Sequence, residues 1–198
     1  MKQNNHHDLC FTLLLILCGK GLSILPDDSR LLLQMHNQYR ELVAHGELHT
    51  QPGAQFMTVL TWDDDLARNA QFLASQCVVG HDKAQDRRTA EFPLVGQNWA
   101  GVGNYTEAVR RWFDENVFYN YWTNKCEPKK VCGHYTQIVW AKTRKLGCGI
   151  ERCPKSKMPF KYSVVCNYGP AGNFVGQRPY DTWDYSDEVE DFAFPLIT

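Results

Sequence analysis

Apolar residues recur at helical spacing in three separate stretches of the chain. The first stretch predicts a helix over residues 29–44, with an N-cap at Asp28-Ser29 and an end near Gly46. Its apolar positions are Leu32, Met35, Tyr39, Leu42 and Val43. Residues 46–58 contain two glycines and a proline, and therefore predict a loop.

The second and third stretches also predict amphipathic helices. One follows Trp62 and ends near Cys77, and residues 63–65 place three aspartates on its first turn, where the helix dipole favours negative charge. Its inner face is formed by Leu66, Ala70, Leu73 and Ala74. The other is capped by Thr106 and runs to about Asn116. Its apolar positions are Ala108, Val109, Trp112 and Phe113.

Three further segments predict strands, namely residues 96–101, 145–153 and 162–168. The polar segment 81–92 has no usable period and predicts a loop. Helices mixed with a few antiparallel strands favour an α+β domain or a three-layer α-β-α domain.

The two ends of the chain differ from its middle. Lys2 and two histidines precede an apolar run over residues 9–18, and small residues follow it, as in a secretory signal peptide. The run is shorter than the roughly 20 residues that span a bilayer, so we expect no transmembrane anchor, with a signal anchor as the alternative. We therefore expect a signal peptide at 1–23, one domain at 24–180 and a poorly ordered acidic tail at 181–198.

Composition argues against nucleic-acid binding and indicates an oxidising compartment. A chain of 198 residues with a net charge of −1 has room for one domain with a substantial core, and it lacks the basic excess typical of nucleic-acid binding. Six of the eight cysteines remain after removal of the signal peptide, which predicts three disulfides in an exported protein. Sequence alone allows 15 pairings. A zinc–cysteine site is the alternative, and an oxidising compartment argues against it.

The segment Cys132-Gly133-His134-Tyr135-Thr136-Gln137-Ile138-Val139-Trp140 is the strongest candidate for chemistry. Gly133 has no side chain and Cys132 can be fixed covalently, so His134 can be held rigidly at the lip of a cavity. Such a histidine suits a metal ligand or a general base. It suits a hydrogen-bonded core histidine equally well.

This segment resembles the central motif of the CAP superfamily, which comprises cysteine-rich secretory proteins, antigen-5 venom allergens and class 1 pathogenesis-related proteins. A second segment, Cys166-Asn167-Tyr168-Gly169-Pro170-Ala171-Gly172-Asn173-Phe174, is similar to the family's other diagnostic motif. With His36-Asn37 and Arg40, the resemblance covers roughly residues 29–180, although Ser163 stands where a bulky apolar residue is usual. The resemblance implies a three-layer α-β-α sandwich with the disulfides Cys77–Cys153, Cys126–Cys132 and Cys148–Cys166.

The resemblance also implies a cleft with two histidines and two acids. His81 and His134 match the histidines and Glu115 matches one acid, whereas Gln97 replaces the second acid. Two neutral imidazoles suit Zn²⁺, and a carboxylate can complete the site or orient a bound water. Because Gln97 cannot act as a base, the replacement weakens the case for hydrolysis more than the case for reversible Zn²⁺ binding.

A hydrolase is the alternative in a different class. Ser163 and Thr136 supply hydroxyls near the two motifs, and His134 could serve as their base. In an extended segment Thr136 would share a face with His134, although a core hydroxyl is the simpler interpretation. There is no Gly-x-Ser-x-Gly motif, and the six mature cysteines are committed to disulfides.

Aromatic residues suggest a second ligand. Phe118, Tyr119, Tyr121 and Trp122 form a run that resembles the sterol-binding loop of fungal CAP proteins, and ordinary core packing is the alternative. Asn104 begins an N-glycosylation sequon in a predicted loop.

Together these features predict a secreted, non-enzymatic binding protein that takes a divalent cation at His81, His134 and Glu115 and a sterol or lipid near residues 118–122. The alternatives are a metal-assisted or serine-type hydrolase and an allergen- or venom-like protein that acts through an extracellular protein partner.

Overall fold

The computed structural model describes residues 26–183, so the predicted signal peptide and most of the acidic tail lie outside the described residues. Its centre is a four-stranded sheet in the order β1-β5-β6-β2. These strands are β1 (Thr61–Trp62), β2 (Gly96–Val102), β5 (Lys145–Arg152) and β6 (Tyr162–Gly169). β1 is parallel to β5, and the other pairs are antiparallel.

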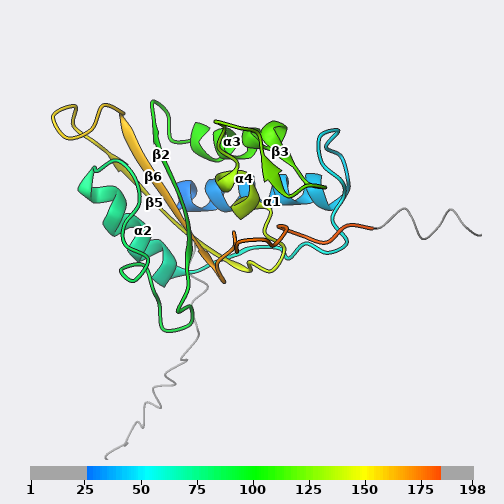
Figure 1. Ribbon diagram of the computed structural model, residues 1–198. Coiled ribbons are helices and arrows are strands. Elements are labelled where there is room, and N and C mark those ends of the chain that lie inside the picture. The colour runs from blue at the N-terminus through cyan, green and yellow to red at the C-terminus, as the bar shows by residue number, and fades with distance from the viewer. Residues whose placement is uncertain (1–25, 184–198) are drawn as a thin grey trace, which may run out of the picture.

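Helices cover both faces of this sheet (Figure 1). On one face lies α2 (Asp64–Gln76). On the other lie α1 (Asp27–Ala44), α3 (Glu107–Phe113) and α4 (Gly133–Ile138). A 3₁₀ helix (Asp114–Phe118) continues α3 and leads into a small hairpin of β3 (Tyr119–Asn120) and β4 (Lys125–Cys126). The predicted three-layer α-β-α sandwich is confirmed.

Two glycines bring α2 directly onto the sheet. A Cβ atom on Gly147 would lie 2.1 Å from the backbone nitrogen of Ala67, and one on Gly149 would lie 2.3 Å from Cα of Gln71. β5 can therefore contact the helix backbone itself. Strand β6 is buried along almost its whole length, because it runs through the middle of the sheet with helices on both sides.

The predicted helix ends are partly correct. The Oδ1 of Asp63 accepts the N–H of Leu66 at 2.9 Å and caps α2, which ends at Cys77 in the left-handed conformation (φ 55°). The predicted N-cap of α1 is wrong, whereas Thr106 does occupy the N-cap position of α3. α1 begins at Asp27 after Pro26 without a side-chain cap, and the Thr106 hydroxyl makes no capping hydrogen bond.

Residues 133–138 form a helix, so Thr136 does not share a face with His134 as it would in an extended segment. The β-branched sequence favours a strand, but tertiary contacts override this preference. The carboxylate of Glu115 accepts the N–H groups of His134 and Tyr135, and the carbonyl of Cys132 accepts that of Thr136. The two bonds to Glu115 satisfy donors that a helix N-terminus leaves unpaired, and the bond from Thr136 is the first regular bond of the helix.

Covalent and polar contacts hold the layers together. The three disulfides have the pairing that the resemblance implied: Cys77–Cys153, Cys126–Cys132 and Cys148–Cys166. Arg40 of α1 is 2% exposed and donates hydrogen bonds to five backbone carbonyls. These carbonyls belong to Thr58, Ile138, Trp140, Ala141 and Thr143. Within residues 26–183 there is no helix of the length and apolarity that crossing a membrane requires.

Candidate functional site

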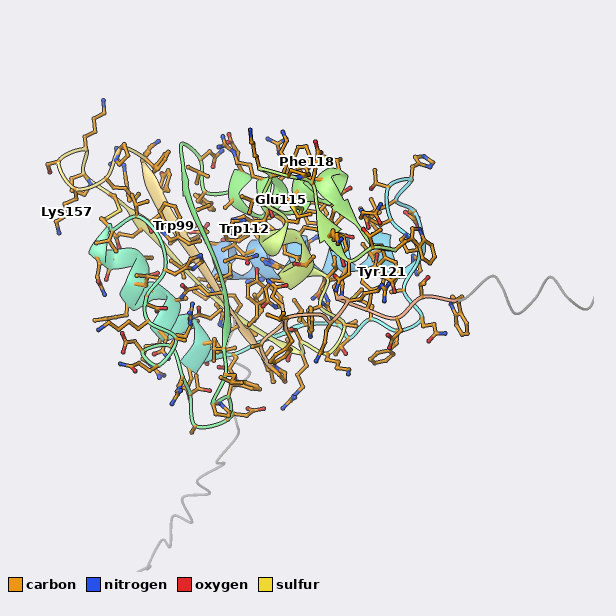
Figure 2. All side chains as sticks on the ribbon, viewed as in Figure 1. Trp99, Trp112, Glu115, Phe118, Tyr121 and Lys157 are labelled. Atoms are coloured by element: carbon orange, nitrogen blue, oxygen red, sulfur yellow. A yellow bond between two sulfur atoms is a disulfide. The ribbon has the colours of Figure 1, made fainter. Side chains whose placement is uncertain are left out.

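The first half of the site is the pair of His134 and Glu115. The Nδ1 of His134 lies 2.6 Å from Oε1 of Glu115, while Oε2 accepts the backbone N–H of His134 at 3.0 Å. The imidazole also stacks on Trp112, with ring centroids 5.9 Å apart and planes 24° apart. Figure 2 shows Trp112 and Glu115 in the layer formed by α1, α3 and α4. The carboxylate of Glu115 thus holds both the ring and the backbone of His134, and Trp112 packs against the face of the ring.

The second half of the site is the pair of His81 and Gln97. The Nε2 of Gln97 donates to Oδ1 of Asn167 at 2.9 Å, which leaves Oε1 as an acceptor. The Nδ1 of His81 lies 2.8 Å from this Oε1 and is therefore the donor. Gln97 and Asn167 are directly opposite in the β2–β6 register, so the sheet sets the position at which His81 is held.

Both histidines therefore carry the Nδ1 hydrogen. An acceptor oxygen faces Nδ1 in each, and the structure gives neither Nε2 a partner among residues 26–183. A neutral imidazole whose Nδ1–H is fixed by an oxygen is the usual form of a histidine metal ligand. Each ring can thus offer an Nε2 lone pair to a metal ion.

The three predicted metal ligands do not form one cluster. The structure pairs His134 with Glu115 and His81 with Gln97, and residues 26–183 contain no group of three His, Cys, Asp or Glu residues arranged to hold a metal. Glu115 instead binds the N-terminus of α4 and the Nδ1 of His134. Its role is to orient a histidine, and a metal bound here would take its remaining ligands from water or a partner.

A buried hydrogen-bond network, which the sequence did not reveal, lies beneath the site. The Nδ1 of His36 bonds to the carbonyl of Leu32 at 2.7 Å, and its Nε2 bonds to the hydroxyl of Tyr168 at 2.8 Å. The Nδ2 of Asn98 donates to this hydroxyl at 3.0 Å and to the carbonyl of His134 at 3.1 Å. Burial lowers the pKa of His36 to about 4, so the network is neutral at physiological pH.

The hydroxyls of Ser163 and Thr136, the nucleophile candidates of the hydrolase hypothesis, form hydrogen bonds with groups other than histidine. Ser163 is fully buried, and its Oγ accepts the indole N–H of Trp99 at 3.2 Å. Thr136 donates to the carbonyl of Cys132 at 3.1 Å and lies 2.7 Å from Oδ1 of Asn173. Among the described residues neither hydroxyl bonds to a histidine, so the structure provides no nucleophile–base pair of the kind that such catalysis needs.

The aromatic run divides into core and surface. Tyr119 and Tyr121 are buried, and Tyr121 stacks on Tyr180 with centroids 4.9 Å apart. Trp122 is 60% exposed, and Phe118 is half-buried beneath the ammonium group of Lys130. All four aromatic residues line an open hollow of about 500 Å³ beside the Cys126–Cys132 loop.

Asn104 lies on the surface, in the turn between β2 and α3. Its Oδ1 accepts the backbone N–H of Thr106 at 3.2 Å. The side chain is exposed, as the predicted glycosylation requires.

Comparison with known proteins assigns the sequence and fold of this chain to one family. The model of the family "CAP: Cysteine-rich secretory protein family" matches residues 33–168. Venom allergen 5 of Polistes fuscatus is 40% identical over 176 residues, which cover 81% of this chain and 82% of that protein. Peptidase inhibitor 16 of Mus musculus is 37% identical over 165 residues, which cover 82% of this chain and only 31% of that protein.

Solved structures give the same result. Schistosoma mansoni venom allergen-like protein 4 matches with a TM-score of 0.73 and 31% identity, over 82% of this chain and 99% of that one. The crystal structure of NaASP2 with Zn²⁺ matches with a TM-score of 0.63 and 29% identity, over 80% of this chain and 90% of that one.

Proposed function

Because the chain belongs to the cysteine-rich secretory protein (CAP) family, we propose that it is a secreted, non-enzymatic binding protein that takes up Zn²⁺ reversibly at His81 and His134. The observation that carries this proposal is that both imidazoles are hydrogen-bonded through Nδ1, which leaves the Nε2 lone pair of each available to a metal ion. Similarity to a protein crystallised with Zn²⁺ adds support. Six cysteines joined in three disulfides fit an extracellular location.

The residues present suit an exchangeable ion better than a structural one. Structural zinc sites are closed by four protein ligands, whereas the proposed site offers two imidazoles. The carboxylate of Glu115 already accepts backbone N–H groups of α4, and the side chain of Gln97 is uncharged, so neither residue adds a strong metal ligand. When bound, the ion would supply a positive centre whose remaining positions are open to water or to an anionic group of a partner.

Calorimetric titration of Zn²⁺ into the disulfide-intact protein tests this proposal. His81→Ala and His134→Ala should each abolish the binding isotherm, whereas His49→Ala, at an exposed loop position, should leave it unchanged. Binding that persists in either cleft variant would overturn the proposal. Loss in all three variants would point to non-specific binding by surface histidines.

A sterol or lipid at the aromatic hollow is the second candidate function. Its support is the exposed apolar surface of Trp122 and Val117, which are 60% and 58% exposed beside a hollow of about 500 Å³. Trp122→Ala should weaken binding of a fluorescent sterol and leave Zn²⁺ binding unchanged. Trp183→Ala, at a tryptophan that is 65% exposed, is the matched control. If sterol binding is absent or indifferent to Trp122, an extracellular protein partner becomes the better candidate.

A further inference from the structure

A loop with four basic residues projects from the sheet between β5 and β6. Arg152, Lys155, Lys157 and Lys161 are all exposed, and we call residues 152–161 the basic loop. Three of these cations line a hollow of about 740 Å³, and Lys157 stands at the outer end of the loop (Figure 2). The three that line the hollow are Arg152, Lys155 and Lys161.

The basic loop is rigidly held. Cys153 is joined to Cys77 at the end of α2, and its N–H donates to the carbonyl of Lys161 at 2.9 Å. Met158 is 1% exposed and anchors the loop, while its N–H bonds to the carbonyl of Pro154 at 3.2 Å. The cations therefore stand on a fixed backbone, which reduces the entropy that a ligand must overcome on binding.

The hollow has an apolar floor. Phe160 occupies the space that a side chain on Gly101 would fill, and its ring meets the edge of Trp99 at a centroid distance of 6.4 Å. Pro154 and Pro159 add further apolar surface. Phe160 is 40% exposed, so it remains accessible to a ligand.

The charges of the basic loop are not neutralised by neighbouring acids. Among residues 26–183, none of the ion pairs involves the four cations. The nearby carboxylate of Glu151 lies 3.4 Å from Nε2 of Gln71, and that of Asp28 accepts the hydroxyl of Tyr105 at 2.6 Å. In a chain with a net charge of −1, this is a local concentration of positive charge.

We propose that the basic loop binds a sulfated polysaccharide chain. A guanidinium group matches the oxygens of a sulfate or carboxylate, and lysines along the loop can pair with successive anionic groups of a polymer. The outer end of the loop carries Lys155, Ser156 and Lys157 and no exposed apolar side chain, so it is poorly suited to insertion into a bilayer. The loop adjoins the Val102–Tyr162 end of the sheet, whereas Gln97 lies toward the other end of β2. This site is therefore separate from the histidine pair.

Titration of a heparin-derived oligosaccharide into the full, disulfide-intact protein at about 0.15 M salt tests the proposal. The variant Arg152→Gln/Lys155→Gln/Lys161→Gln should bind roughly tenfold to a hundredfold more weakly, since it loses three exposed ion pairs. Its matched control is Lys125→Gln/Lys130→Gln/Lys142→Gln, which changes the net charge equally and should bind as the wild type does. Circular dichroism verifies that both variants fold.

The other outcomes overturn the proposal. Equal weakening in both variants would mean that binding follows net charge and not this loop. Binding to phosphatidylserine vesicles without binding to the oligosaccharide would assign the loop to membrane surfaces instead. An oligosaccharide from which the sulfates have been removed should bind weakly; if it binds as tightly as the sulfated one, the loop does not recognise sulfate.

Discussion

One carboxylate, that of Glu115, holds both the ring and the backbone of His134. Oε1 lies 2.6 Å from Nδ1 of the imidazole, and Oε2 accepts the backbone N–H at 3.0 Å. The same group therefore accepts hydrogen bonds from the first turn of α4 and orients His134, the single histidine of that helix. Helix formation and the proposed Zn²⁺ binding would therefore both depend on this one residue.

Glu115→Ala should therefore affect two measurements at once. Zn²⁺ affinity is expected to fall about 10- to 100-fold, because the imidazole loses the acceptor that orients it. The free energy of unfolding should fall by about 1–2 kcal/mol, because α4 loses its N-terminal acceptor. Calorimetry and urea denaturation measure these effects. Asp114→Ala is the control, because its carboxylate is exposed and pairs only with Arg110; similar losses in this variant would contradict the interpretation.

Gln97→Glu should raise the Zn²⁺ affinity by up to about tenfold, because a carboxylate would make a charge-assisted hydrogen bond to Nδ1 of His81. The same change removes the donor to Oδ1 of Asn167, a fully buried residue. We therefore expect a loss of about 1–3 kcal/mol in the free energy of unfolding. Gln177→Glu, at an exposed position, controls for added charge. Unchanged Zn²⁺ affinity would mean that Gln97 does not orient His81.

Arg40→Met should destabilise the protein by about 3 kcal/mol or more. Methionine fills similar space but removes the buried donor to the carbonyls of residues 58, 138, 140, 141 and 143, and each such loss is worth about 1–3 kcal/mol. Guanidinium denaturation compares the free energy of unfolding of the variant with that of the wild type. Arg68→Met removes an exposed pair with Asp65 and should change stability by less than about 1 kcal/mol. Equal effects of the two substitutions would show that the buried contacts of Arg40 contribute little.

Stability should fall in mild acid because of His36. Its pKa is lowered by burial, and to a lesser extent by Arg40, from 6.5 to about 4 in the folded protein. Between these two pH values the unfolded chain binds more protons, so the free energy of unfolding decreases as the pH falls, by about 3 kcal/mol in total. His36→Gln should flatten this part of the profile, measured by urea denaturation from pH 7 to pH 4. A wild-type profile that His36→Gln does not alter would assign the acid sensitivity to carboxylates.

The sequence predicted elements whose determinants are local. α2 was correctly placed because the Asp63 cap and the apolar face both lie within its own residues. α4 was missed because its helical state depends on Glu115, which lies 19 positions before His134 and reaches it only through the fold. The disulfide pairing followed from family resemblance, since spacing alone left 15 possibilities.

The contacts among the predicted site residues differ from the expected arrangement. The family resemblance implied His81, His134 and Glu115 as a ligand set, whereas Glu115 contacts His134 and Gln97 contacts His81. The pairing of His81 with Gln97 depends on the β2–β6 register, which sequence spacing does not encode. The basic loop was missed for a similar reason, because its cations alternate with neutral residues and gather only around the turn of the folded hairpin.

The disulfide between Cys77 and Cys153 constrains two segments at once, the one that leads to His81 and the basic loop. Cys77 ends α2 four residues before His81, and Cys153 begins the turn that carries Lys155 and Lys157. A thiol reductant that opened this single bond would free both the segment that leads to His81, the proposed metal ligand, and the basic loop. The proposed Zn²⁺ binding and the proposed polysaccharide binding should then both weaken in a reducing environment and return on reoxidation.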